Sequence, residues 1–114
     1  MIAVIFEVEP RAGAAPRYFE LAASLRAELE AIDGFLSVER FESLARPGRF
    51  LSLSFWRDEA SVRAWRCHGM HRRAQQEGRD DVLAGYRLRV ATVARDYGLH
   101  RRDEAPADSR SALI

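Results

Sequence analysis

The chain has 114 residues, of which 47% are hydrophobic and 31% are charged. This balance is typical of a single globular domain with a modest core, and it excludes a disordered chain. Eighteen basic and 17 acidic residues leave a formal net charge of +1. Such a charge supplies no strong positive field, which excludes binding of nucleic acid or of an anionic membrane surface by general electrostatics.

Targeting and redox features favour the cytoplasm. In the first ten residues, apolar side chains alternate with Glu7 and Glu9, and the stretch lacks a basic segment followed by the apolar run of a signal peptide. No apolar run approaches the roughly 20 residues that a membrane helix requires. Cys67 is the only cysteine, so an intrachain disulfide is impossible, and no Cys or His spacing typical of a metal site surrounds it. We predict a cytoplasmic protein without a metal, in which Cys67 is a small buried side chain.

The first half of the chain predicts a strand, a helix and a hairpin. Residues 2–9 alternate with the two-residue period of a strand. From Pro16 to Asp33, apolar residues recur every three or four positions, which predicts an amphipathic helix. Gly34 can then adopt the left-handed conformation that ends a helix. Residues 35–42 and 49–56 are strand-like runs separated by a Pro-Gly turn, and we expect them to form an antiparallel hairpin.

The second half predicts a broken helix and a last strand. Asp58 is a suitable N-cap for a helix through Trp65, and Gly69 bends or breaks that helix before a second stretch that runs to Gly78. Residues 86–97 alternate again and predict a strand.

The order of these elements predicts an α+β fold of the ferredoxin-like βαββαβ type with an antiparallel sheet. Residues 1–98 would form this domain. Residues 99–114 carry charged residues and a proline without any period, which predicts a mobile C-terminal tail.

Both faces of the predicted sheet are apolar. In the second hairpin strand, Leu51, Leu53 and Phe55 lie on one side, and Phe50 and Trp56 lie on the other. Helices in such a fold cover one face only, so the second face requires a partner. A two-fold pairing of identical sheets is the commonest solution, and we therefore predict a homodimer.

Residues 50–87 combine a strand ending in Trp, a helix start with Asp and Ala, and a helix on which His residues follow a Trp. The residues that carry this pattern are Trp56, Asp58, Ala60, Trp65, His68, His71 and Tyr86. The pattern resembles the antibiotic biosynthesis monooxygenase (ABM) family. The resemblance implies a dimeric α/β barrel with one pocket per subunit, between the sheet and the helices.

The resemblance also implies a function, that of an oxidoreductase that oxidises a small aromatic, phenolic or quinol-like molecule without a cofactor. Ser61, Trp65, His71 and Arg87 fall near the positions of the substrate-contacting residues of such members. We expect His71 to remove a proton from the substrate and Arg87 to stabilise the resulting anion. The expected substrate-binding residues are Ser61, Trp65, Trp56, His68 and Gln75.

One alternative is a barrel without catalytic activity that only binds a small molecule or supports a partner. Histidines on an amphipathic helix are often structural, and Trp56 and Trp65 can both be core residues. Arg87 and Arg89 can pair across the sheet with Glu7, Glu9 or Glu39, and for Arg89 such structural pairing is the favoured interpretation.

A second alternative is haem degradation, which the family also includes. Trp65 matches those members, but their axial His position falls at Gln75, and the chain contains no Asn to match their first-strand Asn. His71 would have to act as a displaced haem ligand, which disfavours this alternative.

Overall fold

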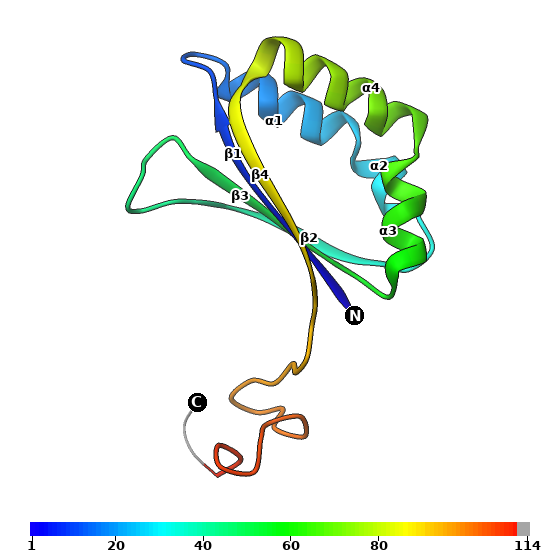
Figure 1. Ribbon diagram of the computed structural model, residues 1–114, viewed down its shortest axis with the longest axis vertical. Helices are drawn as coiled ribbons and strands as arrows, with labels where there is room; N and C mark the ends of the chain where they lie inside the picture. Colours follow the sequence, from blue (N-terminus) through cyan, green and yellow to red (C-terminus); the bar gives the residue numbers. More distant parts are fainter. Residues whose placement is uncertain (112–114) are drawn as a thin grey trace.

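The computed structural model describes residues 1–111, except for the side chain of Asp80. Four strands form one antiparallel sheet in the order β2-β3-β1-β4, and the helices lie on one side of it (Figure 1). The strands are β1 (Ile2–Pro10), β2 (Phe35–Glu42), β3 (Phe50–Trp56) and β4 (Leu83–Thr92). The predicted α+β, ferredoxin-like arrangement and its hairpin are confirmed.

Four helices and one π-helical turn cover the sheet. They are α1 (Ala15–Ser24), α2 (Arg26–Glu30), α3 (Glu59–Arg66), α4 (Gly69–Glu77) and the π turn η1 (Gly78–Val82). Among the described helices, none is long and apolar enough to cross a membrane.

The prediction of one unbroken helix from Pro16 to Asp33 is wrong, because the chain breaks at Leu25 between α1 and α2. The backbone N–H of Leu25 donates to the carbonyl of Ala22 at 3.3 Å, which is the tighter i to i−3 spacing. The bend lets Leu29 of α2 enter the core. Apolar period alone could not reveal this break, since neither glycine nor proline marks it.

The core lies between the helices and the central strand β1, which pairs with β3 on one side and β4 on the other. Side chains alternate along a strand, so every second residue of β1 faces the helices. Two buried clusters result: one contains Ile2, Leu29, Trp56 and Val62, and the other contains Val8, Tyr18 and Val82.

The last strand occupies Leu83–Thr92 instead of the predicted residues 86–97. β4 ends at Thr92 because this residue pairs with Ile2, the first residue of β1, and no further residue of β1 is available for pairing. Val93 makes one more hydrogen bond, from its N–H to the carbonyl of Met1 at 3.0 Å.

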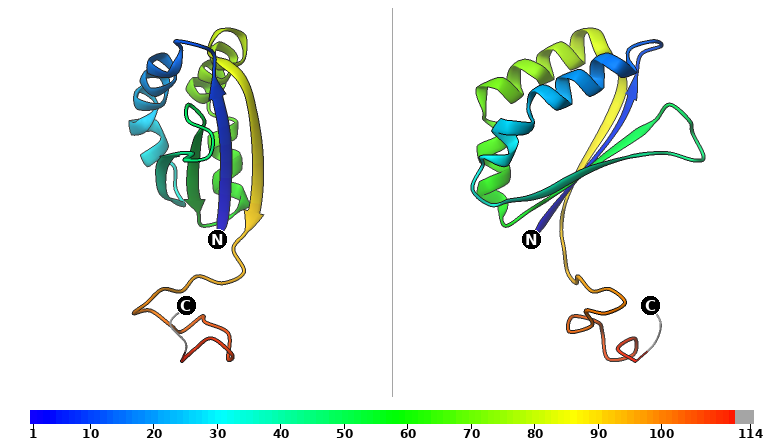
Figure 2. Two further views of the ribbon diagram at one scale, coloured as in Figure 1. Left: turned by 90° about the vertical axis from the view of Figure 1, so that its left-hand side faces the viewer. Right: turned by 180° about the vertical axis from the view of Figure 1, so that it is seen from behind.

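Residues 93–111 leave the sheet and form turns away from the domain (Figure 2). Arg102 organises these turns: its guanidinium lies 5.4 Å from the centre of the Tyr97 ring and donates to the carbonyls of Gly98 and Ser109. Ala105 is buried within the segment. The mobility of residues 99–114 stays a prediction, and its last three residues lie outside the described part of the chain.

Candidate functional site

The start of α3 depends on a capping box between Asp58 and Ser61. Asp58 accepts a hydrogen bond from the Ser61 N–H at 2.9 Å, and the Ser61 hydroxyl donates to the Asp58 carbonyl at 2.8 Å. The Arg57 guanidinium, with the Ser61 N–H, lowers the pKa of Asp58 to about 2. The carboxylate is therefore ionised and suits a helix N-terminus.

Ser61 is also packed tightly against the turn before β2. Gly34 has a φ of 93°, which confirms the predicted left-handed conformation. A Cβ added there would lie 2.7 Å from the Cβ of Ser61, so only glycine fits. Ser61 is 3% exposed, and its hydroxyl serves the helix cap. Its position lends no support to the predicted contact with substrate.

Trp56 is a core residue. It is 1% exposed, its indole N–H donates to the Ser54 hydroxyl at 2.9 Å, and its ring meets the edge of Phe35. A fully buried ring with a satisfied N–H has no free surface for a ligand. Its predicted role in substrate binding likewise gains no support from its surroundings.

Trp65 and His71 are brought together by the break between α3 and α4. His68 adopts an extended conformation and caps α4, since its Nδ1 accepts a hydrogen bond from the Met70 N–H at 3.3 Å. The break falls at Cys67 and His68, and Gly69 is the first residue of α4, so one continuous face from Trp65 to Gln75 does not exist. The His71 ring instead stacks on Trp65 with centroids 4.5 Å apart, and the His68 ring lies 5.5 Å from the same indole.

The surroundings of His71 keep its imidazole neutral and oriented. Burial lowers its pKa, only partly opposed by the hydrogen bond to the Trp65 carbonyl. The Nδ1 atom lies 3.1 Å from that carbonyl oxygen, which can only accept, so Nδ1 carries the hydrogen. The lone pair is then on Nε2, and His71 has the tautomer of an oriented general base.

Gln75, the remaining candidate on α4, is exposed. No buried residue lies anywhere on α4.

An apolar row on β4 lies on the same side of the sheet as these rings. Tyr86, Leu88 and Val90 pair with Val8, Phe6 and Val4 and so face the helices, yet they are 61%, 50% and 44% exposed. Tyr86 also meets Phe6 edge to face at 5.6 Å. We call Tyr86, Leu88 and Val90 the β4 apolar row. None of these three residues was among the predicted substrate-binding residues, although the alternation of residues 86–92 already places their side chains together.

Arg87 points to the opposite, helix-free face. It pairs in register with Glu7, whose carboxylate binds Arg89 at 2.7 Å and Arg49 at 2.6 Å. The predicted structural role of Arg89 is confirmed. The expectation that Arg87 and His71 act on one substrate is wrong for a single subunit, because the sheet separates them and neighbouring residues on a strand face opposite ways.

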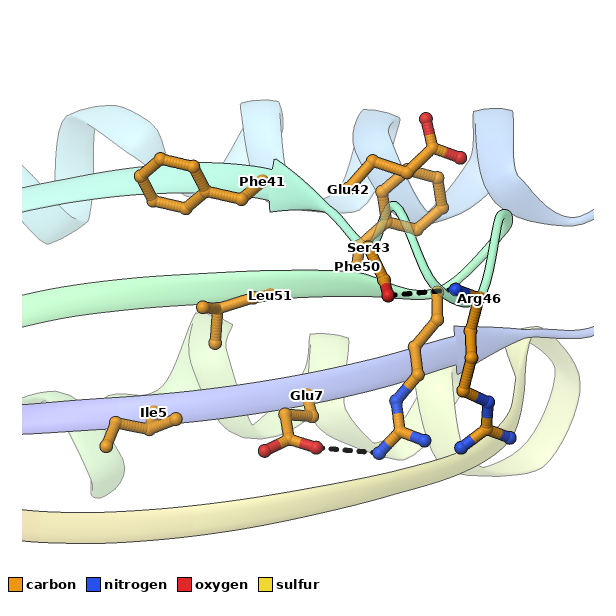
Figure 3. Close-up of a pocket in the computed structure, with 9 residues that line it drawn as sticks. Ile5, Glu7, Phe41, Glu42, Ser43, Arg46, Phe50 and Leu51 are labelled. Carbon is orange, nitrogen blue, oxygen red and sulfur yellow. Dashed lines mark hydrogen bonds and ion pairs between the residues drawn. The ribbon is translucent and has the colours of Figure 1, made fainter.

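The helix-free face also holds a cavity of about 420 Å³. Figure 3 shows Ile5, Leu51 and Phe41 on three neighbouring strands, with Glu7 and Arg46 toward the hairpin end. The resemblance implies a pocket between sheet and helices instead. This cavity is therefore a second feature, separate from the Trp65 and His71 pair.

Cys67 is exposed, so its predicted burial is wrong. The helix break places it at the surface, where a hydrogen bond from Arg72 lowers the pKa of its thiol. Within residues 1–111, no group of three or more His, Cys, Asp or Glu side chains could hold a metal ion.

Solved structures share this fold. Rv0793 from Mycobacterium tuberculosis superposes with a TM-score of 0.75 at 19% identity, over 83% of this chain and 96% of that one. PA3566 from Pseudomonas aeruginosa gives a TM-score of 0.69 at 17% identity, over 81% and 92%. At these identities the likeness is one of fold.

Sequence relatives point to a family. A jasmonate monooxygenase ABM of Pyricularia oryzae is 53% identical over 93 residues, which is 82% of this chain and 43% of that protein. The uncharacterized protein YqjZ of Bacillus subtilis is 36% identical over 62 residues, covering 54% of this chain and 53% of YqjZ. The chain thus spans about half the length, or less, of these relatives. The family model for antibiotic biosynthesis monooxygenase matches residues 1–77, and the chain belongs to that family.

Proposed function

We propose that this chain is an oxygenase that binds a small apolar, electron-rich molecule between α4 and the β4 apolar row, and that His71 is its general base. The observation that carries this proposal is the state of His71. Its Nδ1–H is held by the Trp65 carbonyl, its ring is stacked on an indole, and its pKa is lowered by burial.

The chemistry follows from the neutral imidazole. Nε2 takes a proton from a phenol, a quinol or an activated methylene, and the resulting anion can pass an electron to molecular oxygen. Conversion of a methylene to a carbonyl by one oxygen molecule releases one water, so the reaction needs no added reductant or cofactor. The imidazolium that forms on His71 supplies positive charge beside the substrate anion, the role first expected of Arg87.

Sequence similarity supports the reaction class. The relative that is 53% identical over 82% of this chain is named a jasmonate monooxygenase. Jasmonic acid is a small molecule with a ketone that activates neighbouring C–H bonds, so it belongs in the substrate panel beside phenols and quinols.

We also propose that the protein is a homodimer. Apolar Ile5, Leu51, Leu53 and Phe55 share the helix-free face, and the described helices leave it uncovered. A second copy of the same sheet would bury this face symmetrically.

Oxygen consumption tests the proposal. Purified protein is incubated with a naphthol, a quinol and jasmonic acid, each with and without added NADPH, and products are identified by mass spectrometry. His71→Gln keeps the size and polarity of the side chain but removes the base, and we expect turnover to fall about 100-fold or more. Arg101→Ala, in the C-terminal segment, is the control and should retain activity.

Three results would redirect the proposal. Full turnover by His71→Gln would remove His71 as the base. Saturable binding without turnover of any compound would favour a binding barrel. A Soret band on titration with hemin, lost in His71→Gln, would favour haem chemistry.

A further inference from the structure

We propose that His68 is the hydrogen-bond donor of the site, and that its Nε2–H stabilises the oxygen on which negative charge collects when His71 takes a proton from the substrate. This inference rests on the proposed function, because it adds a second group to the same reaction.

The tautomer of His68 follows from its place at the start of α4. Its Nδ1 accepts a hydrogen bond from the Met70 N–H at 3.3 Å, and its backbone carbonyl accepts one from the Arg72 N–H at 2.9 Å. A ring nitrogen that accepts from an N–H must carry a lone pair. The hydrogen of the neutral imidazole is therefore on Nε2, and no hydrogen bond within the described residues engages that N–H.

His68 and His71 thus have opposite tautomers. The Nδ1–H of His71 is held by the Trp65 carbonyl at 3.1 Å, which leaves a lone pair on Nε2. In each ring a backbone group fixes the tautomer: the Trp65 carbonyl lies before the helix break, and the Met70 N–H lies after it. The break between α3 and α4 therefore sets one ring nitrogen as an acceptor and the other as a donor.

The two rings lie against one side chain. His71 stacks on Trp65 with centroids 4.5 Å apart and 18° between the planes, and His68 lies 5.5 Å from the same indole at 34°. They are close enough that a positive charge on His68 lowers the pKa of His71. Both rings are half-buried, where a hydrogen bond to a ligand meets less competition from water.

Arg72 is the other cation that acts on His71. Its side chain is exposed, and it donates to the Cys67 sulfur at 3.6 Å. His68 is better suited as the donor, because its ring is half-buried against the same indole as the base.

This pair suits a substrate in which an oxygen receives the negative charge. A phenol gives its O–H proton to Nε2 of His71, and the electron pair of that bond stays on the phenol oxygen. A ketone gives a proton from a neighbouring carbon, and the charge collects on the ketone oxygen. In both cases the Nε2–H of His68 donates to that oxygen, and the bond is stronger for the anion than for the neutral molecule. His68 shares this stabilisation with the imidazolium of His71.

NMR tests the tautomers without any ligand. Long-range ¹H–¹⁵N spectra of the labelled full chain, recorded at about pH 7.5, distinguish the two nitrogens of each ring. We expect the hydrogen on Nε2 in His68 and on Nδ1 in His71. A hydrogen on Nδ1 of His68 would overturn the proposed donor.

Binding of para-nitrophenol tests the donor in the site. This phenol is yellow when ionised, and its electron-poor ring resists oxidation, so it binds without turnover. We expect the wild type to prefer the ionised form, so that the bound probe ionises at a lower pH than the free probe. Displacement by 1-naphthol, an apolar phenol, identifies the site.

Two substitutions separate the donor from the helix cap. His68→Asn places an amide oxygen near the position of Nδ1 and removes the N–H at Nε2, so affinity for the ionised probe should fall about tenfold. His68→Gln places an amide N–H near Nε2 and gives up the cap. It should recover affinity to about threefold below the wild type, with a lower urea midpoint than His68→Asn. His100→Asn, the same change at an exposed histidine, is the control.

The outcomes distinguish the donor from the site as a whole. Equal ionisation of the bound probe in the wild type and His68→Asn would assign His68 to the helix cap alone. Turnover that is lost in His71→Gln but kept in His68→Asn would overturn the donor and leave the proposed function. No binding of the probe to the wild type would overturn the proposed site and the donor together.

Discussion

The two faces of the sheet expose apolar side chains in different ways. On the helix-free face, Leu51 and Leu53 form a broad apolar surface, and the carboxylate of Glu7 beside it is bound by two arginines of the same chain. Glu39, which pairs in register with Leu53, adds a second carboxylate to this face. On the helix side, only the short β4 apolar row is uncovered, and a neutral histidine lies on the neighbouring helix. Broad apolar surfaces suit a second protein chain, whereas a short row beside a titratable group suits a small molecule.

The largest expected effect is on the oligomeric state, and it tests whether the helix-free face is the dimer interface. Leu53→Asp places a charge at the centre of the helix-free face, where a second sheet would bury it without a partner. We expect light scattering to show a shift from about 26 kDa, twice the 13.0 kDa of the chain, to the monomer mass.

Leu88→Asp is the matched variant on the other face. It should keep the dimer mass and weaken binding of 1-naphthol. A monomeric wild-type protein would contradict the proposed dimer, and dissociation caused by Leu88→Asp would place the dimer interface on the helix side of the sheet.

A smaller effect separates structure from substrate binding at Ser61. Ser61→Ala removes the hydroxyl from the capping box and should lower the free energy of unfolding by about 1 kcal/mol, measured by urea titration. Turnover at a temperature where the variant is fully folded should match the wild type. A loss of turnover larger than the loss of folded protein would restore Ser61 as a substrate contact.

The smallest expected effect is a pH dependence from His71. Because its pKa is lowered in the folded state, the unfolded chain binds a proton more readily. The contribution of neutral His71 to the free energy of unfolding is fully present above pH 6.5, the ordinary pKa of histidine. It is lost as the pH falls toward the lowered pKa of the folded state. Urea titrations between pH 7.5 and about 5, above the range of most carboxyl groups, should show that the free energy of unfolding decreases as the pH is lowered. His71→Gln should make this dependence on pH weaker. An identical slope in the variant would show that the burial of His71 carries no cost.

Much of the fold was predictable because local chemistry and tertiary structure agree. Alternation located three strands within a residue or two, Asp58 capped α3 as expected, and Gly34 took the left-handed conformation. The break at Leu25 was not predictable, since it serves the placement of Leu29 in the core and leaves no local signal.

The site was only half predictable, for a geometric reason. Spacing along a continuous helix could not foresee that a break would stack His71 on Trp65. The side of the sheet on which Arg87 lies could have been inferred, because it alternates with Leu88 and pairs with Glu7. The sequence gives no reason to place the substrate site on the face of β4 that carries Leu88 rather than on the face that carries Arg87.

The central position of β1 also governs how the protein can fold. The β2 and β3 hairpin can form from neighbouring residues, but β1 is the first strand in the chain and must also wait for β4, whose Thr92 pairs with Ile2. Loops of that length close slowly and favour slow folding. Until β4 arrives, one edge of β1 offers unpaired backbone groups to any passing strand, and that interval is when this chain is most open to aggregation.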